Sequence, residues 1–423
     1  MSKVLISGFL NKKGSKFGFW HKRYVVANGS QIIISKSQTD KPERYINMNS
    51  DVSIESQSEI SPPRFTLTPK GEKPITLATN SLEELNDWLN QLRSMTYMTS
   101  GISMDDFDVI SVLGRGFYGK VMLCHKKNTK DIFAIKTVHK NRLVSAKKVH
   151  TIFTERDVLM KAQHPFIVSL KFAFQTDTKV YLGLEYAPGG ELFYHLQKFG
   201  SFPIDDVRIY IAEMALALDF LHKHGVIYRD IKPENILLDA QGHVKLTDFG
   251  LAKNLTEESS TTTFCGTFEY MAPEVVAREK YGPAIDWWAL GILTYELLNG
   301  HSPFQSDNRA LLFMAIRTQP LKFPARTDRN TIDFISHLLA KDPEDRYGME
   351  EIRTHPFFNG MNFDDVLERK YKPSFVPTIP NDVAALNFDS EFTCEPAQDS
   401  IATPVGQGNE FNGFSFVAPG EGQ

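Results

Sequence analysis

The chain has 423 residues, of which 42% are hydrophobic and 12% aromatic. This content is ample for burial, and the length predicts two or three domains. A net charge of −4 argues against a general nucleic-acid binder. The three widely spaced cysteines, Cys124, Cys265 and Cys394, match neither a disulfide framework nor a zinc site, which indicates a reducing compartment.

Charge is distributed unevenly along the chain. Residues 1–98 carry 13 basic and 9 acidic side chains, whereas residues 359–423 carry 3 and 10. The N-terminal part could therefore favour an anionic surface, and the tail could not. Signal-peptide, membrane-spanning and lipidation signals are missing from the sequence, and Ser2 stands where myristoylation needs glycine. The expectation is a soluble intracellular protein.

The first 98 residues predict a small β-rich domain. Residues 4–13, 20–27 and 31–37 read as short strands separated by turns that contain glycine or asparagine. Residues 81–92 have the apolar spacing of an amphipathic helix, and Ser81 with Glu84 forms a capping-box start. This order predicts a β-barrel capped by one helix, followed by a polar linker over residues 99–106.

The following part of the chain changes from strands to helices. Strands around one long helix, roughly 145–162, are expected up to residue 177. Beyond residue 193, helices dominate, and the nearly all-apolar segment 286–300 predicts a buried helix. Asp286 opens that helix, and we expect it to find a partner near residues 228–230. From about residue 359, an extended tail is expected, ordered only where it packs.

Five short segments in this middle part carry the chemistry. They are LGRGFYGKV, FAIK, a helical segment with a glutamate, YRDIKPEN and DFG, followed by APE. Their candidate functional residues are Gly114, Gly116, Gly119, Lys136, Glu155, Asp230, Asn235 and Asp248. Each segment alone is weak, but together and in this order they resemble the signature of a protein kinase. The resemblance implies a bilobal fold that transfers a phosphoryl group from ATP.

Phosphoryl transfer explains the residue types, because it requires mainly positioning and charge stabilisation. Lys136 is expected to hold phosphates and to pair with Glu155, although Glu155 could also be a solvated helix charge. Asp230 would accept the proton of the incoming hydroxyl, and Lys232 would neutralise the transferred group. Asn235 and Asp248 are oxygen ligands suited to Mg²⁺. The remaining ATP-site candidates are Val121, Leu184 as gatekeeper, Glu185, Ala187 and Glu191.

More specific features resemble the AGC serine/threonine kinases and, within them, the Akt (protein kinase B) family. These features are Tyr228 before Arg229-Asp230, the segment TTTFCGTFEYMAPE and the ending FNGFSF. The resemblance implies an α+β multidomain chain: a PH-like domain over residues 1–98, a linker over 99–106, a kinase domain over 107–358 and an AGC tail over 359–423. Phosphorylation by an upstream kinase is implied at Thr263, Thr403 and Ser415. On composition alone, Thr261 and Thr262 rival Thr263.

The PH resemblance implies binding to a phosphoinositide membrane. Lys12 and Arg23 match its phosphate-binding pattern, Lys73 lies near another expected contact, and His21 stands where a basic residue is expected. A histidine is only partly charged near neutral pH, so this contact is weakened. Two alternatives remain open. The domain could bind protein in a soluble AGC kinase, or the chain could be a catalytically silent adaptor.

The AGC resemblance also implies substrates with arginines upstream of the phosphorylated serine or threonine. Glu191 and Glu234 match the carboxylates used for those arginines, and Glu296 is a further candidate. Phe268 replaces the proline that relatives have beside the following substrate residue, which leaves that preference open. We expect a monomer in the cytoplasm that is recruited to the plasma membrane and binds no nucleic acid.

Overall fold

The computed structural model describes residues 4–14, 19–28, 31–48, 52–57, 60–69, 71–97, 102–129, 131–255, 261–381, 385–402, 410–411 and 413–417. The chain divides into two compact units. The first comprises residues 1–106, 171–182 and 403–423, and the second comprises residues 107–170 and 183–402. None of the helices formed by the described residues has both the length and the apolar character needed to cross a membrane.

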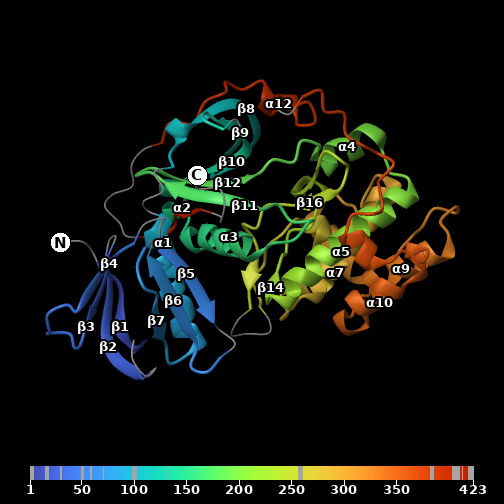
Figure 1. The fold of residues 1–423 in the computed structure, drawn as a ribbon. Helices are drawn as coiled ribbons and strands as arrows, with labels where there is room; N and C mark the ends of the chain where they lie inside the picture. Colours follow the sequence, from blue (N-terminus) through green and yellow to red (C-terminus); the bar gives the residue numbers. More distant parts are fainter. Residues whose placement is uncertain are drawn as a thin grey trace. The chain divides into compact units, whose positions relative to one another are not determined.

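The first unit contains an antiparallel seven-stranded sheet in the order β4-β3-β2-β1-β7-β6-β5, shown at the blue end of the colour bar (Figure 1). One helix follows the sheet. The bounds are β1 Val4–Lys13, β2 Trp20–Asn28, β3 Gln31–Ser35, β4 Arg44–Asn47, β5 Val52–Gln57, β6 Arg64–Pro69, β7 Ile75–Ala78 and α1 Leu82–Tyr97. The predicted strand-rich domain closed by a helix is therefore confirmed.

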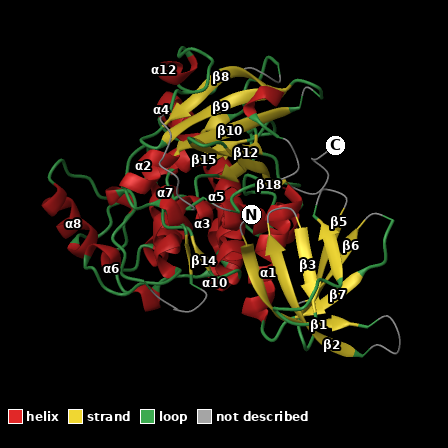
Figure 2. Ribbon diagram, turned by 90° about the vertical axis from the view of Figure 1, so that its left-hand side faces the viewer, coloured by secondary structure: helices red, strands yellow, loops and turns green. Residues whose placement is uncertain are grey.

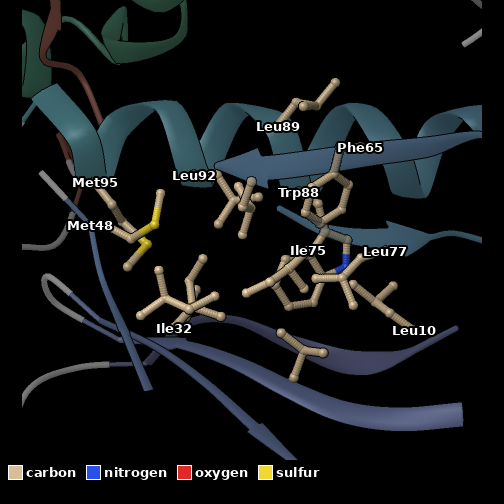
Figure 3. Packing of buried hydrophobic residues seen from close by; sticks show 14 of the residues in the cluster. Leu10, Ile32, Met48, Phe65, Ile75, Leu77, Trp88, Leu89, Leu92 and Met95 are labelled. Carbon is tan, nitrogen blue, oxygen red and sulfur yellow. The ribbon is translucent and has the colours of Figure 1, made fainter. Parts of the chain in front are cut away.

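The core of this domain forms where α1 lies across the sheet (Figure 3). Trp88 of α1 stacks on Phe65 of β6, with ring centroids 6.4 Å apart. The helix begins as predicted, because the Ser81 hydroxyl accepts the Glu84 backbone N–H at 3.1 Å. The Glu84 carboxylate in turn accepts the backbone N–H of Asn80 at 2.8 Å. The first bond satisfies an N–H group that a helix start leaves without a partner, whereas the second reaches Asn80 instead of the Ser81 N–H that a capping box uses.

Two further segments of the first unit pair with each other. Strand β11 (Leu170–Gln175) is antiparallel to β18 (Phe416–Val417), with Phe172 opposite Val417 and Ala173 opposite Phe416. Strand β12 spans Lys179–Glu185. The end of the tail thus forms a strand in the part that the structure describes.

The second unit begins with three antiparallel strands and two helices (Figure 2). They are β8 Phe107–Arg115, β9 Gly119–Lys126, β10 Ile132–His139, α2 Lys140–Ser145 and α3 Val149–Lys161. The predicted single helix over 145–162 is therefore wrong at its start. Lys147 adopts a left-handed backbone (φ 55°), which ends one helix before the next begins.

Helices form most of the rest of this unit. Helix α7 is buried along nearly its whole length, as its apolar sequence predicts, and it ends at Gly300 with φ 79°. The helices are α4 Leu192–Phe199, α5 Ile204–Lys223, α6 Pro273–Val276, α7 Ala284–Asn299, α8 Arg309–Thr318, α9 Arg329–Leu338 and α10 Met349–Thr354. Short strand pairs join β13 Gly190–Glu191 to β15 Ile236–Leu238, β15 to β16 Val244–Leu246, and β14 Val226–Ile227 to β17 Lys253–Asn254.

The tail is mostly extended and belongs to the second unit as far as residue 402. It contains two short helices, α11 Phe363–Leu367 and α12 Ser390–Thr393. Ser374 anchors it to α5 by donating its backbone N–H and its hydroxyl to the two Asp206 carboxylate oxygens, at 2.6 and 2.7 Å. An extended chain that is ordered where it packs on other elements is what its composition predicts.

Candidate active site

An ion-paired cluster lies where β10, α3 and the segment after β16 meet. The Lys136 Nζ donates to Glu155 Oε1 at 2.7 Å and to Asp248 Oδ1 at 3.1 Å. Burial disfavours the charged form of Lys136, but Asp248 and Glu155 outweigh this effect and raise the pKa of the ammonium. Lys136 in turn lowers the pKa of Asp248. The cluster therefore holds a fixed cation beside an ionised carboxylate, and Glu155 is not a solvated surface charge.

A second cluster surrounds the Asp230 carboxylate. Asn235 Nδ2 donates to Asp230 Oδ2 at 2.8 Å, and the Thr267 hydroxyl donates to Oδ1 at 3.3 Å. The Lys232 Nζ lies 3.3 Å from Oδ2. These donors fix the carboxylate plane, so Asp230 can receive a proton in one defined orientation.

Asp286, at the start of α7, anchors the loop that carries Asp230. Its carboxylate accepts the backbone N–H groups of Tyr228 and Arg229, both at 2.9 Å, as expected from the sequence. Arg229 and Asp248 both have left-handed backbones, with φ 72° and 53°. Such strained conformations persist only where surrounding contacts impose them, and they cluster at functional sites.

A glycine-rich turn between β8 and β9 covers a cavity of about 480 Å³. Gly116 donates its backbone N–H to the Gly119 carbonyl at 2.9 Å. A Cβ on Gly119 would lie 1.7 Å from the Thr137 carbonyl oxygen, so only glycine fits there. The residues that line this cavity include Gly114, Val121, Lys136, Glu155, Asp230 and Asp248.

An adjoining cavity of about 250 Å³ has apolar walls and a polar rim. Its walls include Val121, Ala134, Leu184 and Ala187, whereas Glu185 and Glu191 line its edge. Glu185 is held in place by the Lys245 Nζ at 2.7 Å and the Ser169 hydroxyl at 3.1 Å. A flat apolar ring fits these walls, and phosphates fit beneath the glycine turn beside Lys136. The two cavities together suit ATP.

The donor set beside these cavities also suits a hard divalent cation. Asp248 offers a carboxylate of which half the side chain is exposed. Asn235 uses its amide nitrogen on Asp230, which leaves its amide oxygen as the atom that would ligate the cation. Oxygen donors of these two kinds are the ligands that Mg²⁺ prefers.

Phe388 is a cavity residue that the sequence analysis missed. It lies on the tail, lines the apolar cavity, and stacks on Tyr186 with ring centroids 6.0 Å apart. Asn387 fixes this segment by donating its side-chain N–H groups to the carbonyls of Pro188 and Thr378, at 3.0 and 3.1 Å. The residue is about 200 positions from Tyr186, so no local pattern pointed to it.

Carboxylates gather on one side of Asp230. Burial, together with the charges of Glu234 and Asp389, raises the pKa of Glu191 to about 7. Burial and Glu234 also raise the pKa of Glu269 and, with Glu269 itself, that of Glu296. Glu296 accepts a hydrogen bond from the Tyr270 hydroxyl. Mutual repulsion of this kind is relieved when a cation binds.

The activation segment places Thr263 close to basic side chains. The Tyr281 hydroxyl donates to the Thr263 carbonyl at 2.6 Å and also contacts the Arg229 guanidinium at 3.2 Å. Lys253 donates to the Thr261 hydroxyl at 2.8 Å, and that hydroxyl lies 3.2 Å from the hydroxyl of Thr263. Thr261 is buried whereas Thr263 is exposed, so Thr263 is the more accessible of the two.

The lipid-binding candidates gather at one end of the N-terminal sheet. Lys12 and His21 are register partners on β1 and β2 and, with Arg23, share the face of the strands that carries the buried Leu10 and Val25. Lys73 is exposed in the β6–β7 turn at the same end. However, Arg23 already pairs with Glu43 at 2.7 Å. An incoming phosphate would compete with that carboxylate.

The tail contains two candidate phosphorylation sites, Thr403 and Ser415. Thr403 lies outside the described residues. Ser415 is half-buried between Phe414 and Phe416, which are both buried, as is Phe411. Gln175 of β11 donates to the Phe411 carbonyl at 2.8 Å. The aromatic ending is thus packed rather than free.

Two protein-family models match separate parts of the chain. A protein kinase domain model matches residues 107–358, and a PH domain model matches residues 4–97. The chain is 44% identical to the serine/threonine-protein kinase YPK1 of Saccharomyces cerevisiae over 75% of this chain and 48% of that protein. It is 43% identical to the serine/threonine-protein kinase Sgk2 of Homo sapiens over 74% of this chain and 89% of that protein.

A further relative is similar along nearly its whole length. The RAC family serine/threonine-protein kinase homolog of Dictyostelium discoideum is 35% identical over 98% of this chain and 97% of that protein. By contrast, the chain spans about half the length of the yeast relatives that it matches.

Proposed function

Because the chain belongs to the protein kinase family, in its AGC serine/threonine branch, and also carries a PH domain, we propose that it phosphorylates serine and threonine residues of proteins at the expense of ATP. The observation that carries the proposal is the arrangement of Lys136, Glu155, Asp230 and Asp248 around one cavity beneath a glycine turn.

Each charged group has a distinct task in the proposed reaction. ATP with Mg²⁺, when bound, supplies the transferable phosphoryl group and neutralises its charge. Lys136, oriented by Glu155, binds phosphate oxygens, and Asp248 with Asn235 would hold the cation. Asp230 receives the proton of the acceptor hydroxyl. Lys232, 3.3 Å from Asp230, stabilises negative charge that develops beside it.

The carboxylate side of the site supports a preference for arginine upstream of the acceptor. Burial and the Glu234 charge raise the pKa of Glu191 to about 7 and also raise the pKa of Glu296, and a bound guanidinium would relieve this repulsion. A peptide of the type Arg-x-Arg-x-x-Ser should therefore exceed acidic or proline-directed peptides in kcat/KM. Glu191→Gln should reduce that advantage. A peptide library without selection for upstream arginine would contradict this part of the proposal.

Regulation by an upstream kinase follows from two packed segments. A phosphate on Thr263 would lie near Lys253 and Arg229, and Arg–phosphate pairs order activation segments. A phosphate on Ser415 would sit beside β18, where the buried aromatics already hold the tail. Thr403 is the third proposed site. Mass spectrometry of the activated chain, with Thr263→Ala as comparison, tests the assignment.

We further propose that the PH domain recruits the chain from the cytoplasm to phosphoinositides of the plasma membrane. Lys12 and His21 support this, because they share one end of the sheet with Arg23 and Lys73. Lys12→Ala should release the chain from phosphoinositide liposomes.

A second candidate role for the PH domain has its own observation. The Arg23–Glu43 ion pair already satisfies one expected phosphate ligand, which favours a domain that binds protein instead of lipid. Glu43→Gln distinguishes the two roles. It should strengthen liposome binding if phosphate competes for Arg23. Liposome binding that is unchanged by Lys12→Ala and by Glu43→Gln would favour the protein-binding role.

A further inference from the structure

Three phenylalanines form an aromatic cluster beside the proposed acceptor position. Phe264 and Phe268 belong to the activation segment, and Phe313 belongs to α8. Their ring centroids lie 5.7 to 6.4 Å apart. Phe268 directly follows Thr267, whose hydroxyl bonds the proposed catalytic Asp230. The cluster is therefore next to the place where a substrate hydroxyl must sit, and Phe268 is 41% exposed there.

Two guanidinium groups lie on this cluster. The Arg309 guanidinium is 4.1 Å from the Phe268 centroid, 5.1 Å from that of Phe313 and 5.5 Å from that of Phe264. Arg278 lies 5.3 Å from the Phe264 centroid. Both arginines are exposed, and within the described ranges neither forms an ion pair. Stacking fixes their planar groups in place, so little side-chain entropy remains to be lost on binding.

The arginines on the aromatic cluster carry the opposite charge to the carboxylates that interact with Glu234. Glu269 follows Phe268 directly, but it interacts with Glu234 and thus belongs to the acidic group. On α8, Arg309 and Phe313 are four residues apart and therefore share one face of the helix. The structure therefore holds two groups of opposite charge near Thr267 and Asp230: carboxylates that interact with Glu234, and arginines over the aromatic cluster.

We propose that Arg309, supported by Arg278, selects substrates that carry a carboxylate side chain shortly after the phosphorylated residue. The inference rests on the proposed kinase function and adds a preference for a residue that follows the phosphorylated one. Because Phe268 is exposed and directly follows Thr267, the residue after the acceptor would pass close to it. An extended peptide advances about 3.3 Å per residue. A carboxylate two or three residues after the acceptor therefore comes within reach of the guanidinium stacked on Phe268.

The test compares four peptides on the full chain. All share Arg-x-Arg-x-x-Ser, and the third residue after serine is Glu, Gln, Ala or Lys. The Glu peptide should exceed the Lys peptide about fivefold in kcat/KM, through KM rather than kcat, as expected for one exposed charge pair. The ratio should shrink between 50 and 500 mM salt. A repeat with the charge at the second position after serine locates the contact.

Matched variants assign the effect to the proposed residue. Arg309→Gln should bring the Glu to Lys ratio close to one, Arg309→Lys should retain part of it, and Arg278→Gln should reduce it. Arg317→Gln is the control, because Arg317 is an exposed arginine of the same helix that contacts none of the three rings. It should leave the ratio unchanged.

The outcomes separate this inference from the function on which it rests. Equal kcat/KM for Glu and Lys peptides at both positions, with turnover intact, would overturn the role of Arg309 alone. A ratio that survives Arg309→Gln would do the same. If none of the four peptides accepts phosphate, the proposed kinase function fails and the inference falls with it.

Discussion

Glu155→Gln tests how much the buried ion pair contributes to catalysis. Removing one partner of a buried pair costs about 3–5 kcal/mol. Here Lys136 keeps Asp248 at 3.1 Å, and its side chain is 21% exposed. We therefore expect roughly half of that cost, about 2 kcal/mol, to appear in the transition state. At 1.36 kcal/mol per factor of ten, kcat/KM should fall about 30-fold.

The assay is steady-state transfer of labelled phosphate to an Arg-x-Arg-x-x-Ser peptide, with thermal melting measured in parallel. Glu213→Gln is the matched control, because Glu213 on α5 is equally buried and pairs with His243 away from the cavities. It should lower Tm while changing kcat/KM less than threefold. Loss of activity in both variants to the same degree, in step with Tm, would refute a specific role for the Lys136–Glu155 pair.

Three further predictions concern neighbouring features. The kcat/KM advantage of an arginine peptide over an alanine peptide should fall by up to about tenfold between pH 8 and 6. The reason is that burial and neighbouring carboxylates raise the pKa of Glu191 to about 7, so that it is mostly neutral at pH 6. An unchanged ratio, or a fall that persists in Glu191→Gln, would contradict this. Phe388→Ala should raise KM for ATP about tenfold at little cost in kcat, through loss of an aromatic wall; an unaltered KM would remove Phe388 from the nucleotide site. Phe414→Ala with Phe416→Ala, or truncation at residue 405, should cut activity strongly while ATP binding stays measurable, and Ser415→Ala should act more mildly; full activity after truncation would refute the tail as an activator.

The sequence predicted that Lys136 pairs with Glu155, because both residues lie in segments of a recognisable order. The backbone of each segment has few conformations available, so Asp230, Asn235 and Thr267 meet wherever those segments fold. Asp286 was predictable for another reason. A charge that opens an apolar helix must find donors, and the nearby Tyr228 and Arg229 backbone supplies them.

Contacts between distant parts of the chain could not be predicted in this way. Phe388 meets Tyr186 only because Asn387 and its carbonyl partners hold the tail there. The arginines on the aromatic cluster are similar, since Arg309 joins the activation segment only through tertiary packing. The start of the helix predicted over 145–162 was wrong for a local reason. The left-handed backbone at Lys147 interrupts an otherwise helical sequence, and a lysine gives no signal of it.

Asp230→Asn in the full chain tests the central claim most directly. The substitution keeps the shape of the side chain and an oxygen for the Asn235 amide, but it removes the proton acceptor. Transfer of labelled phosphate from ATP to an Arg-x-Arg-x-x-Ser peptide should fall by about 10²–10⁴-fold at unchanged Tm. Near-normal turnover in a clean preparation of the variant, or no turnover in the wild-type chain, would contradict phosphoryl transfer at this site.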